Sequence, residues 1–148
     1  MNILIVGPSW VGDMVMAQTL FACLKLRHGP DCQIDVLAPD WSRPILERMP
    51  EVRQALSFPL GHGVLDIAVR RRIGKSLVGR YDQAILLPNS LKSALVPYFA
   101  DIPQRTGWWG EMRYGLLNDL RVLDKERYPL MIERFMALAY APDHQLQT

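Results

Sequence analysis

Short β-branched runs alternate with helical patterns along most of the chain, and this alternation constrains the fold more than any other feature. The first run, Asn2–Val6, is NILIV followed by a Gly-Pro turn, which is typical of a strand buried on both faces. Further strands are predicted at 33–37, 54–58 and 83–87, with a short fifth strand at 105–107. Helices are predicted at 13–27, 44–49, 65–77, 91–100 and 130–140.

Strands that alternate with helices form βαβ units, whose connections are right-handed. The sequence therefore predicts an α/β fold with a Rossmann-like, doubly wound parallel sheet. Ligands of such sheets bind at the carboxyl ends of the strands. The loops to search for function are those that follow the predicted strands, at 7–13, 38–42, 59–66, 88–93 and 107–118.

Composition excludes several classes of protein. The 148 residues have the length of one domain, and 17 Lys and Arg against 15 Asp and Glu leave a net charge of +2, which does not favour a nucleic-acid partner. Cys23 and Cys32 form no CxxC motif and the three histidines are scattered, so we expect reduced cysteines and no metal site. The chain starts without a basic signal-peptide segment, and no apolar run approaches the ~18 residues of a membrane span, so we expect a cytoplasmic protein.

The loop Gly7–Asp13 resembles two phosphate-binding motifs and fits neither. Ser9 occupies the position of the second glycine in GxGxxG. The spacing of Gly7 and Gly12 is that of a P-loop, but Asp13 replaces the lysine, and a carboxylate there repels phosphate. Asp13 has two compatible interpretations: an N-cap of the following helix, or a general base aimed into the cleft.

A cationic cluster follows the third predicted strand. Leu65, Val69, Ile73 and Leu77 recur every four residues and predict the buried face of a helix. On that helix Arg70, Arg71 and Arg72 point in different directions. They form either a solvated helix face or, together with Lys75 and His62, a site for an anionic ligand.

Two more loops carry candidate polar and aromatic groups. After the fourth strand, Ser90 could cap the next helix, while Asn89, Lys92 and Ser93 offer donors for sugar hydroxyls or acid groups. The segment 105–114 contains Trp108 and Trp109 beside glycines. These indoles either pack over the sheet edge or form a stacking platform.

Taken together, these loops resemble a known enzyme family. The matching segments are GPSWVGDMVMAQTL (7–20), APDWSRPILERMPEV (38–52), PLGHGVLDI (59–67), LPNSLKSALVP (87–97), IPQRTGWWGEMRYGLLNDLRVLD (102–124) and PLMIERFMALAY (129–140). Their order and spacing resemble glycosyltransferase family nine, the ADP-heptose-dependent heptosyltransferases. The similarity runs from residue 1 to about residue 141.

The resemblance implies a GT-B architecture, in which two Rossmann-like domains face each other across a cleft. Residues 1–141 would be the N-terminal, acceptor-binding domain, and residues 142–148 a frayed end or the start of a linker. The C-terminal, donor-binding domain is absent, so the chain is expected to be inactive alone and to bind no cofactor itself. The donor of the full-length enzyme would be ADP-heptose, whose L-glycero-D-manno-heptose is transferred with inversion onto the first heptose of the lipopolysaccharide inner core.

The resemblance also implies roles for individual residues. Asp13 aligns with the family's catalytic base. The expected substrate-binding residues are Ser9, Trp10, Gly12, Arg70, Arg71, Arg72, Lys75, Asn89, Lys92, Ser93, Arg105, Thr106, Glu111 and Arg113. No metal ligand is expected. The expected partners are the heptosyl-Kdo-lipid A acceptor, the missing domain and, peripherally, the anionic cytoplasmic face of the inner membrane, to which the arginines would draw the domain.

Two alternatives belong to other functional classes. One is a non-catalytic module that binds an anionic sugar or glycolipid. The other is a small flavodoxin-like nucleotide-binding protein, which rests on fold analogy alone and is disfavoured by Asp13 in the lysine position.

Overall fold

The computed structural model describes residues 1–7, 11–29, 31–57, 66–87, 94–108, 119–121 and 131–139. Its centre is a parallel sheet of six strands in the order β3-β2-β1-β4-β5-β6. The strands are β1 (Asn2–Val6), β2 (Gln33–Ala38), β3 (Val52–Ser57), β4 (Gln83–Leu86), β5 (Gln104–Trp108) and β6 (Asp119–Arg121). This is the strand order of dinucleotide-binding folds, so the predicted doubly wound α/β class is confirmed.

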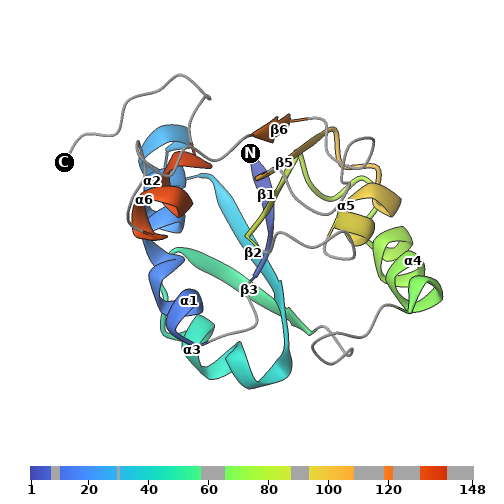
Figure 1. Cartoon of the computed structure of the whole chain (residues 1–148), viewed down its shortest axis with the longest axis horizontal. Helices are drawn as coiled ribbons and strands as arrows, with labels where there is room; N and C mark the ends of the chain where they lie inside the picture. The colour runs from blue at the N-terminus through green and yellow to red at the C-terminus, as the bar shows by residue number, and fades with distance from the viewer. Residues whose placement is uncertain are drawn as a thin grey trace.

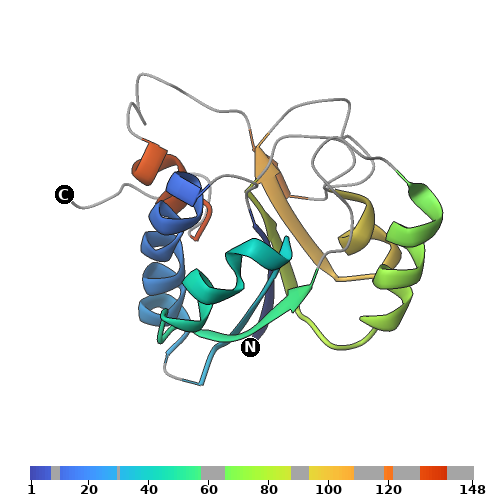
Figure 2. The ribbon, with the colours of Figure 1, turned by 90° about the horizontal axis from the view of Figure 1, so that it is seen from below.

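Helices cover both faces of the sheet (Figures 1 and 2). One face carries α1 (Val11–Met16), α2 (Gln18–His28), a 3₁₀ turn η1 (Asp40–Ser42), α3 (Arg43–Glu47) and α6 (Met131–Ala137). The other face carries α4 (Ile67–Ser76) and α5 (Leu95–Phe99). None of the described helices is long and apolar enough to span a membrane.

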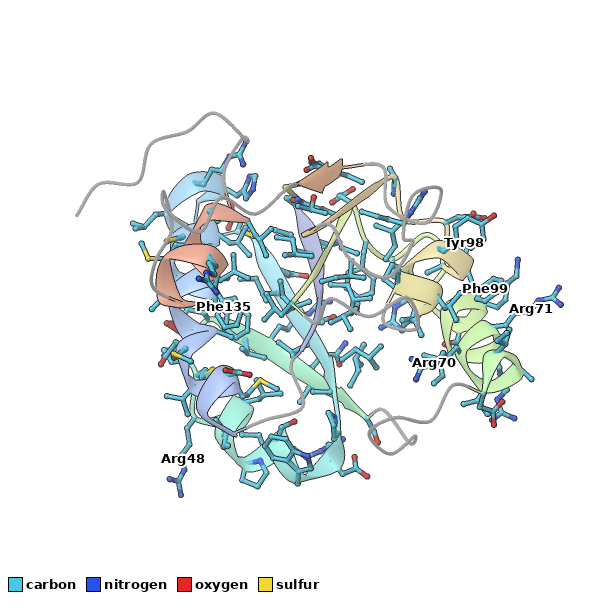
Figure 3. All side chains as sticks on the ribbon, in the orientation of Figure 1. Arg48, Arg70, Arg71, Tyr98, Phe99 and Phe135 are labelled. Carbon is cyan, nitrogen blue, oxygen red and sulfur yellow. The ribbon has the colours of Figure 1, made fainter. Side chains whose placement is uncertain are left out.

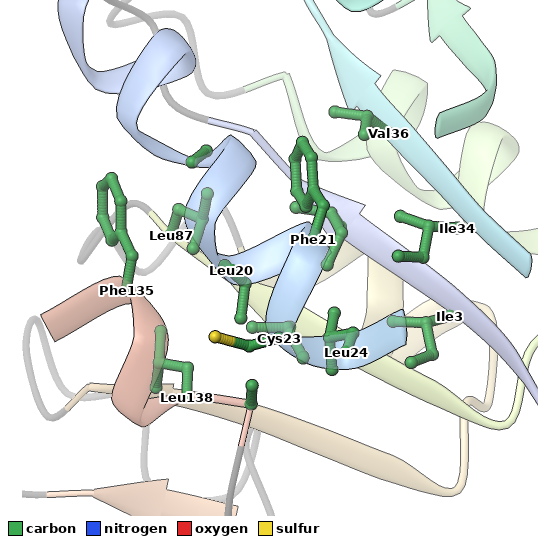
Figure 4. Packing of buried hydrophobic residues seen from close by; sticks show 14 of the residues in the cluster. Ile3, Leu20, Phe21, Cys23, Leu24, Ile34, Val36, Leu87, Phe135 and Leu138 are labelled. Atoms are coloured by element: carbon green, nitrogen blue, oxygen red, sulfur yellow. The ribbon is translucent and has the colours of Figure 1, made fainter. Parts of the chain in front are cut away.

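The larger core lies between the sheet and the first group of helices (Figure 4). Ile3 of β1 and Ile34 of β2 pack in the same cluster as Phe21 of α2 and Phe135 of α6. Alternate residues of β1, such as Leu4, point into the second core beneath α4 and α5. Burial on both faces explains why this strand is a continuous apolar run.

Helix α4 packs very closely against α5. A Cβ atom at Gly74 would lie 2.7 Å from Phe99 Cβ and 2.8 Å from the Val96 carbonyl oxygen, so only glycine fits. The buried positions of α4 are Arg70 and Gly74, with Leu77 just after the helix. The predicted four-residue stripe is right in part: Leu77 is buried and Ile73 packs against the second core, while Leu65 lies outside the described residues. The helix is rotated from that prediction so that Arg70 and Gly74, its smallest residue, are buried and Gly74 meets α5.

Two further expectations need correction. The helix predicted at 13–27 is two helices, α1 and α2, separated at Ala17. The sequence predicts no strand after residue 107, but the structure has a sixth strand at Asp119–Arg121, which is too short to show an alternating pattern. At the start of α3, Ser42 occupies the N-cap position without capping the helix, because its hydroxyl donates to the Pro39 carbonyl oxygen at 2.6 Å. Cys23 and Cys32 are both buried and are not joined in a disulfide.

Candidate functional site

The order of strands reverses between β1 and β4, and ligands of open α/β sheets bind beyond the carboxyl ends at such a point. Val6, the last residue of β1, pairs with Leu37 of β2 and with Leu86 of β4. Gly7, which directly follows β1, therefore lies at this position.

Gly7 and Met14 fix α1 against the end of the sheet. The Gly7 amide donates to the Leu37 carbonyl oxygen at 2.9 Å. A Cβ atom at Gly7 would lie 3.0 Å from Met14 Cε and 3.2 Å from Val36 Cγ1, so the methionine packs where a side chain would otherwise stand. Met14 is completely buried. Buried Met14, the residue next to Asp13, thus holds helix α1 in one place.

Asp13 lies in the first turn of α1 and is half-buried. Because the helix begins at Val11, the N-cap interpretation of Asp13 is wrong, although the carboxylate still complements the helix dipole. No hydrogen bond or ion pair joins its side chain to any residue in the described part of the chain. Gly12 beside it is exposed, and a Cβ atom there would meet no atom within 4 Å. Asp13 is therefore partly exposed, and its place is set by α1.

The arginine cluster divides between two directions (Figure 3). Arg70 is 4% exposed and points from α4 toward the sheet, whereas Arg71, Arg72 and Lys75 are exposed. Burial lowers the pKa of the Arg70 guanidinium, an effect that the Asp66 carboxylate opposes. The expectation that the arginines diverge is confirmed, and a single clamp made of all four cations does not form.

Thr106 and Arg105 have structural roles. The Thr106 hydroxyl, which is fully buried, donates to Asp119 Oδ2 at 2.8 Å and accepts from Gln83 Nε2 at 3.0 Å, so it links three strands. Arg105 is the second residue of β5 and pairs with Ala84 of β4. Its guanidinium donates to the Ile102 carbonyl oxygen at 2.9 Å and stands 5.7 Å from the Tyr98 ring centroid. This structure corrects the expectation that both residues contact substrate, because Thr106 is enclosed and the Arg105 guanidinium is turned back toward the chain that precedes β5.

Seven predicted residues lie outside the described part of the chain and stay predictions: Ser9, Trp10, Asn89, Lys92, Ser93, Glu111 and Arg113.

Sequence reasoning missed one exposed polar pair at the carboxyl edge. The Ser57 hydroxyl at the end of β3 donates to the Asp40 carboxylate just after β2. Their position in the sequence could have identified them, since each is an exposed polar residue at or just after the end of a strand. Among the described residues, no three His, Cys, Asp or Glu side chains gather as metal ligands do.

Comparison with known families and proteins shows which family this chain belongs to. The model of glycosyltransferase family 9 (heptosyltransferase) matches residues 70–147, just over half of the chain. The chain belongs to glycosyltransferase family 9. It is 64% identical over 141 residues to lipopolysaccharide heptosyltransferase 2 of Escherichia coli K12, a match that covers 95% of this chain and 40% of that protein. It is 58% identical over 143 residues to lipooligosaccharide heptosyltransferase 2 of Haemophilus influenzae, covering 97% and 41%.

Solved structures agree with the family. E. coli ADP-heptose lps heptosyltransferase II superposes with a TM-score of 0.89 at 58% identity, covering 98% of this chain and 42% of that one. E. coli heptosyltransferase WaaC with ADP superposes with a TM-score of 0.75 at 19% identity, covering 100% and 49%, and shares the fold. The family 9 chain described here thus spans about 40% of the length of the curated relatives that it matches.

Proposed function

We propose that this chain is the N-terminal, acceptor-binding part of a heptosyltransferase. The longer enzyme would transfer L-glycero-D-manno-heptose from ADP-heptose to the first heptose of the lipopolysaccharide inner core. The proposal is supported by the identity with lipopolysaccharide heptosyltransferase 2 and by one feature of the site: a partly exposed aspartate at the point where strand order reverses. Residues 1–141 would form the domain and residues 142–148 the start of a linker.

In an inverting transfer a single displacement is sufficient. The acceptor oxygen forms a bond to the anomeric carbon, the bond from that carbon to the departing ADP breaks, and the acceptor hydroxyl loses its proton. Asp13 takes that proton as general base. Its carboxylate suits the role because no described side chain occupies it and because buried Met14 holds α1 in place. Accurate positioning contributes to the rate as well as the proton transfer itself.

Residues from the neighbouring loops would hold the acceptor. Ser9, Trp10 and Gly12 belong to the segment after β1, on one side of the reversal point. The segment after β4 contributes Asn89, Lys92 and Ser93, and the segment after β5 contributes Glu111 and Arg113. The acceptor is heptosyl-Kdo-lipid A, which carries carboxylates and phosphates and is embedded in the inner membrane. The enzyme would therefore act peripherally on the cytoplasmic face of that membrane.

Calorimetric titration of this chain tests the assignment of the acceptor. We expect a soluble heptosyl-Kdo fragment to bind and ADP-heptose not to bind appreciably, because the donor would be held by the second domain. Tight binding of ADP-heptose without acceptor binding would mean that the roles of the two domains are reversed.

A chimera tests the reaction itself. Residues 1–139 of this chain would replace the corresponding part of E. coli lipopolysaccharide heptosyltransferase 2, with which the chain is 64% identical. We expect transfer of heptose to the natural acceptor. A chimera that folds and binds acceptor but transfers nothing would favour a non-catalytic binding module.

A further inference from the structure

Three cations share the outward surface of α4. Arg71 and Lys75 are four residues apart and Arg72 and Lys75 are three apart, so their side chains are neighbours on the helix. All three are exposed, and none forms an ion pair or hydrogen bond through its side chain with any residue that the structure describes. Asp66, which accepts from the Val69 amide at 3.2 Å, precedes the helix as its N-cap. We call Arg71, Arg72 and Lys75 the α4 cationic face.

The direction of this face is fixed by the opposite side of the helix. Gly74 brings α4 against α5, with no room for even a methyl group at that contact. Arg70 is buried on the inner side and points toward the sheet, while Arg71 points away from the fold (Figure 3). A rotation of α4 that turned the cationic face inward would drive a side chain into α5.

The spread of the three cations around α4 suits an extended ligand. At 100° per residue, Arg72 lies about 100° around the helix from Arg71, and Lys75 lies between them. Side chains spread over such an arc can contact an extended anionic surface together. Two apolar side chains lie near the ends of the helix, Ile67 at 51% and Val78 at 48% exposure. Cations accompanied by exposed apolar residues are typical of helices that lie in a membrane interface.

We propose that the α4 cationic face docks this protein on an anionic lipid bilayer. The inference rests on the proposed function, which places the acceptor in such a bilayer. Helix α4 follows β3, so its first turn lies at the carboxyl edge of the sheet, the edge that carries Asp13. Docking through the flank of the fold leaves that edge open to the sugars that project from the membrane.

Vesicle sedimentation of this chain tests the proposal. The vesicles contain equal amounts of phosphatidylglycerol and phosphatidylcholine, and vesicles of phosphatidylcholine alone are the neutral reference. Each basic residue near an anionic surface strengthens binding about fivefold, so R71E/K75E should weaken binding by about 25-fold or more. Added salt should weaken the binding of the unmodified chain, because it screens charges at the surface.

The matched control is R43E/R48E, which makes the same change in net charge. Both arginines are exposed, Arg43 as the first residue of α3 and Arg48 directly after its end. Helix α3 covers the opposite face of the sheet, and Arg48 points away from the fold (Figure 3). We expect this variant to bind anionic vesicles within about threefold of the unmodified chain, because its arginines lie away from the membrane, where surface attraction has decayed. Thermal unfolding confirms that each variant is folded before its binding is compared.

Three results would overturn the proposal that α4 docks on the bilayer. Equal loss in both double variants would show that net charge, and not α4, drives binding. Equal binding to neutral and anionic vesicles would exclude charge recognition. R71E/K75E that binds vesicles normally but no longer binds the soluble heptosyl-Kdo fragment would assign these cations to the acceptor site. None of these measurements requires turnover, so failure here leaves the proposed reaction to be judged by the chimera.

Discussion

Two aspartates next to the central strands differ in almost every property that determines what a carboxylate can do. Asp35 of β2 is completely buried and accepts four hydrogen bonds, from Arg53 Nε at 2.9 Å, Arg53 Nη2 at 2.6 Å, Tyr81 Oη at 2.6 Å and Gln54 Nε2 at 3.0 Å. Asp13 of α1 is half-buried and accepts none through its side chain from the described residues. The first is committed to structure, and the second is free for a substrate.

The surroundings of Asp35 explain why its pKa is lowered. Burial by itself would raise the pKa of this carboxyl, but hydrogen bonds from Arg53, Tyr81 and Gln54 outweigh burial and lower it. Burial, reinforced by the Asp35 carboxylate, raises the pKa of the Tyr81 hydroxyl, which stays protonated as a donor. A carboxylate with its lone pairs already engaged is a poor proton acceptor. Partners, and not residue type, separate the two aspartates.

The largest effect is expected on turnover at Asp13. In the chimera described above, Asp13→Asn should lower kcat by about 10²–10⁴-fold, the usual contribution of a general base. KM and the unfolding temperature should change little, because the side chain has no described partner to lose. Steady-state kinetics measure kcat and KM, and thermal unfolding measures the stability of the variant. Asp31→Asn, at an exposed position after α2, is the control; near-normal kcat in Asp13→Asn would refute the base assignment.

Asp35→Ala should have no such selective effect on turnover but should destabilise the fold. Removing one partner of a buried ion pair costs about 3–5 kcal/mol, and we expect about 3 because the Arg53 side chain is 39% exposed and can be rehydrated. Urea unfolding of this chain measures the change. A loss of less than about 0.5 kcal/mol, the range of ordinary surface substitutions, would mean that the network contributes nothing to stability.

Gly7→Ala should affect both stability and catalysis because it forces α1 away from the sheet. The new methyl group would meet Met14 Cε at 3.0 Å and Ala38 Cβ at 3.3 Å, and overpacking of this kind costs about 1–3 kcal/mol. In the chimera kcat should fall more than the affinity for acceptor, because Asp13 moves with the helix. Adding Met14→Leu, which removes the Cε atom, should restore part of both losses. If this second substitution restores neither, Met14 is not the group that positions α1.

The smallest effect expected is on the acid dependence of stability. The lowered pKa of Asp35 means that the folded protein holds this proton less tightly than the unfolded chain, whose pKa is about 3.9. The stabilisation is therefore complete above that value and is lost as the pH falls through it toward the folded pKa. Urea midpoints from pH 7 to pH 3 should converge for the unmodified chain and Asp35→Asn. Parallel pH profiles would contradict the assignment.

Much of the fold and part of the candidate site could be predicted from local patterns. The NILIV run of β1 and the similar runs of β2 and β4 identify buried parallel strands because consecutive apolar residues need two covered faces. Asp13 could be selected because it follows the first strand by a few residues. Strand β6 could not be found, since three residues show no periodicity.

The sequence by itself determined the class of fold, the edge of the sheet at which we expect ligands and the aspartate that follows β1, because each of these depends on residues close together in the chain. Only the tertiary structure decided that Arg70 is buried while Arg71 faces outward, since Gly74 must meet Phe99, 25 residues away, and this contact sets the rotation of α4. It alone also decided that Asp35 finds Arg53 and Tyr81, 18 and 46 residues along the chain. Distant partners are chosen by how helices and strands pack, and no local pattern of apolar and polar residues records that choice.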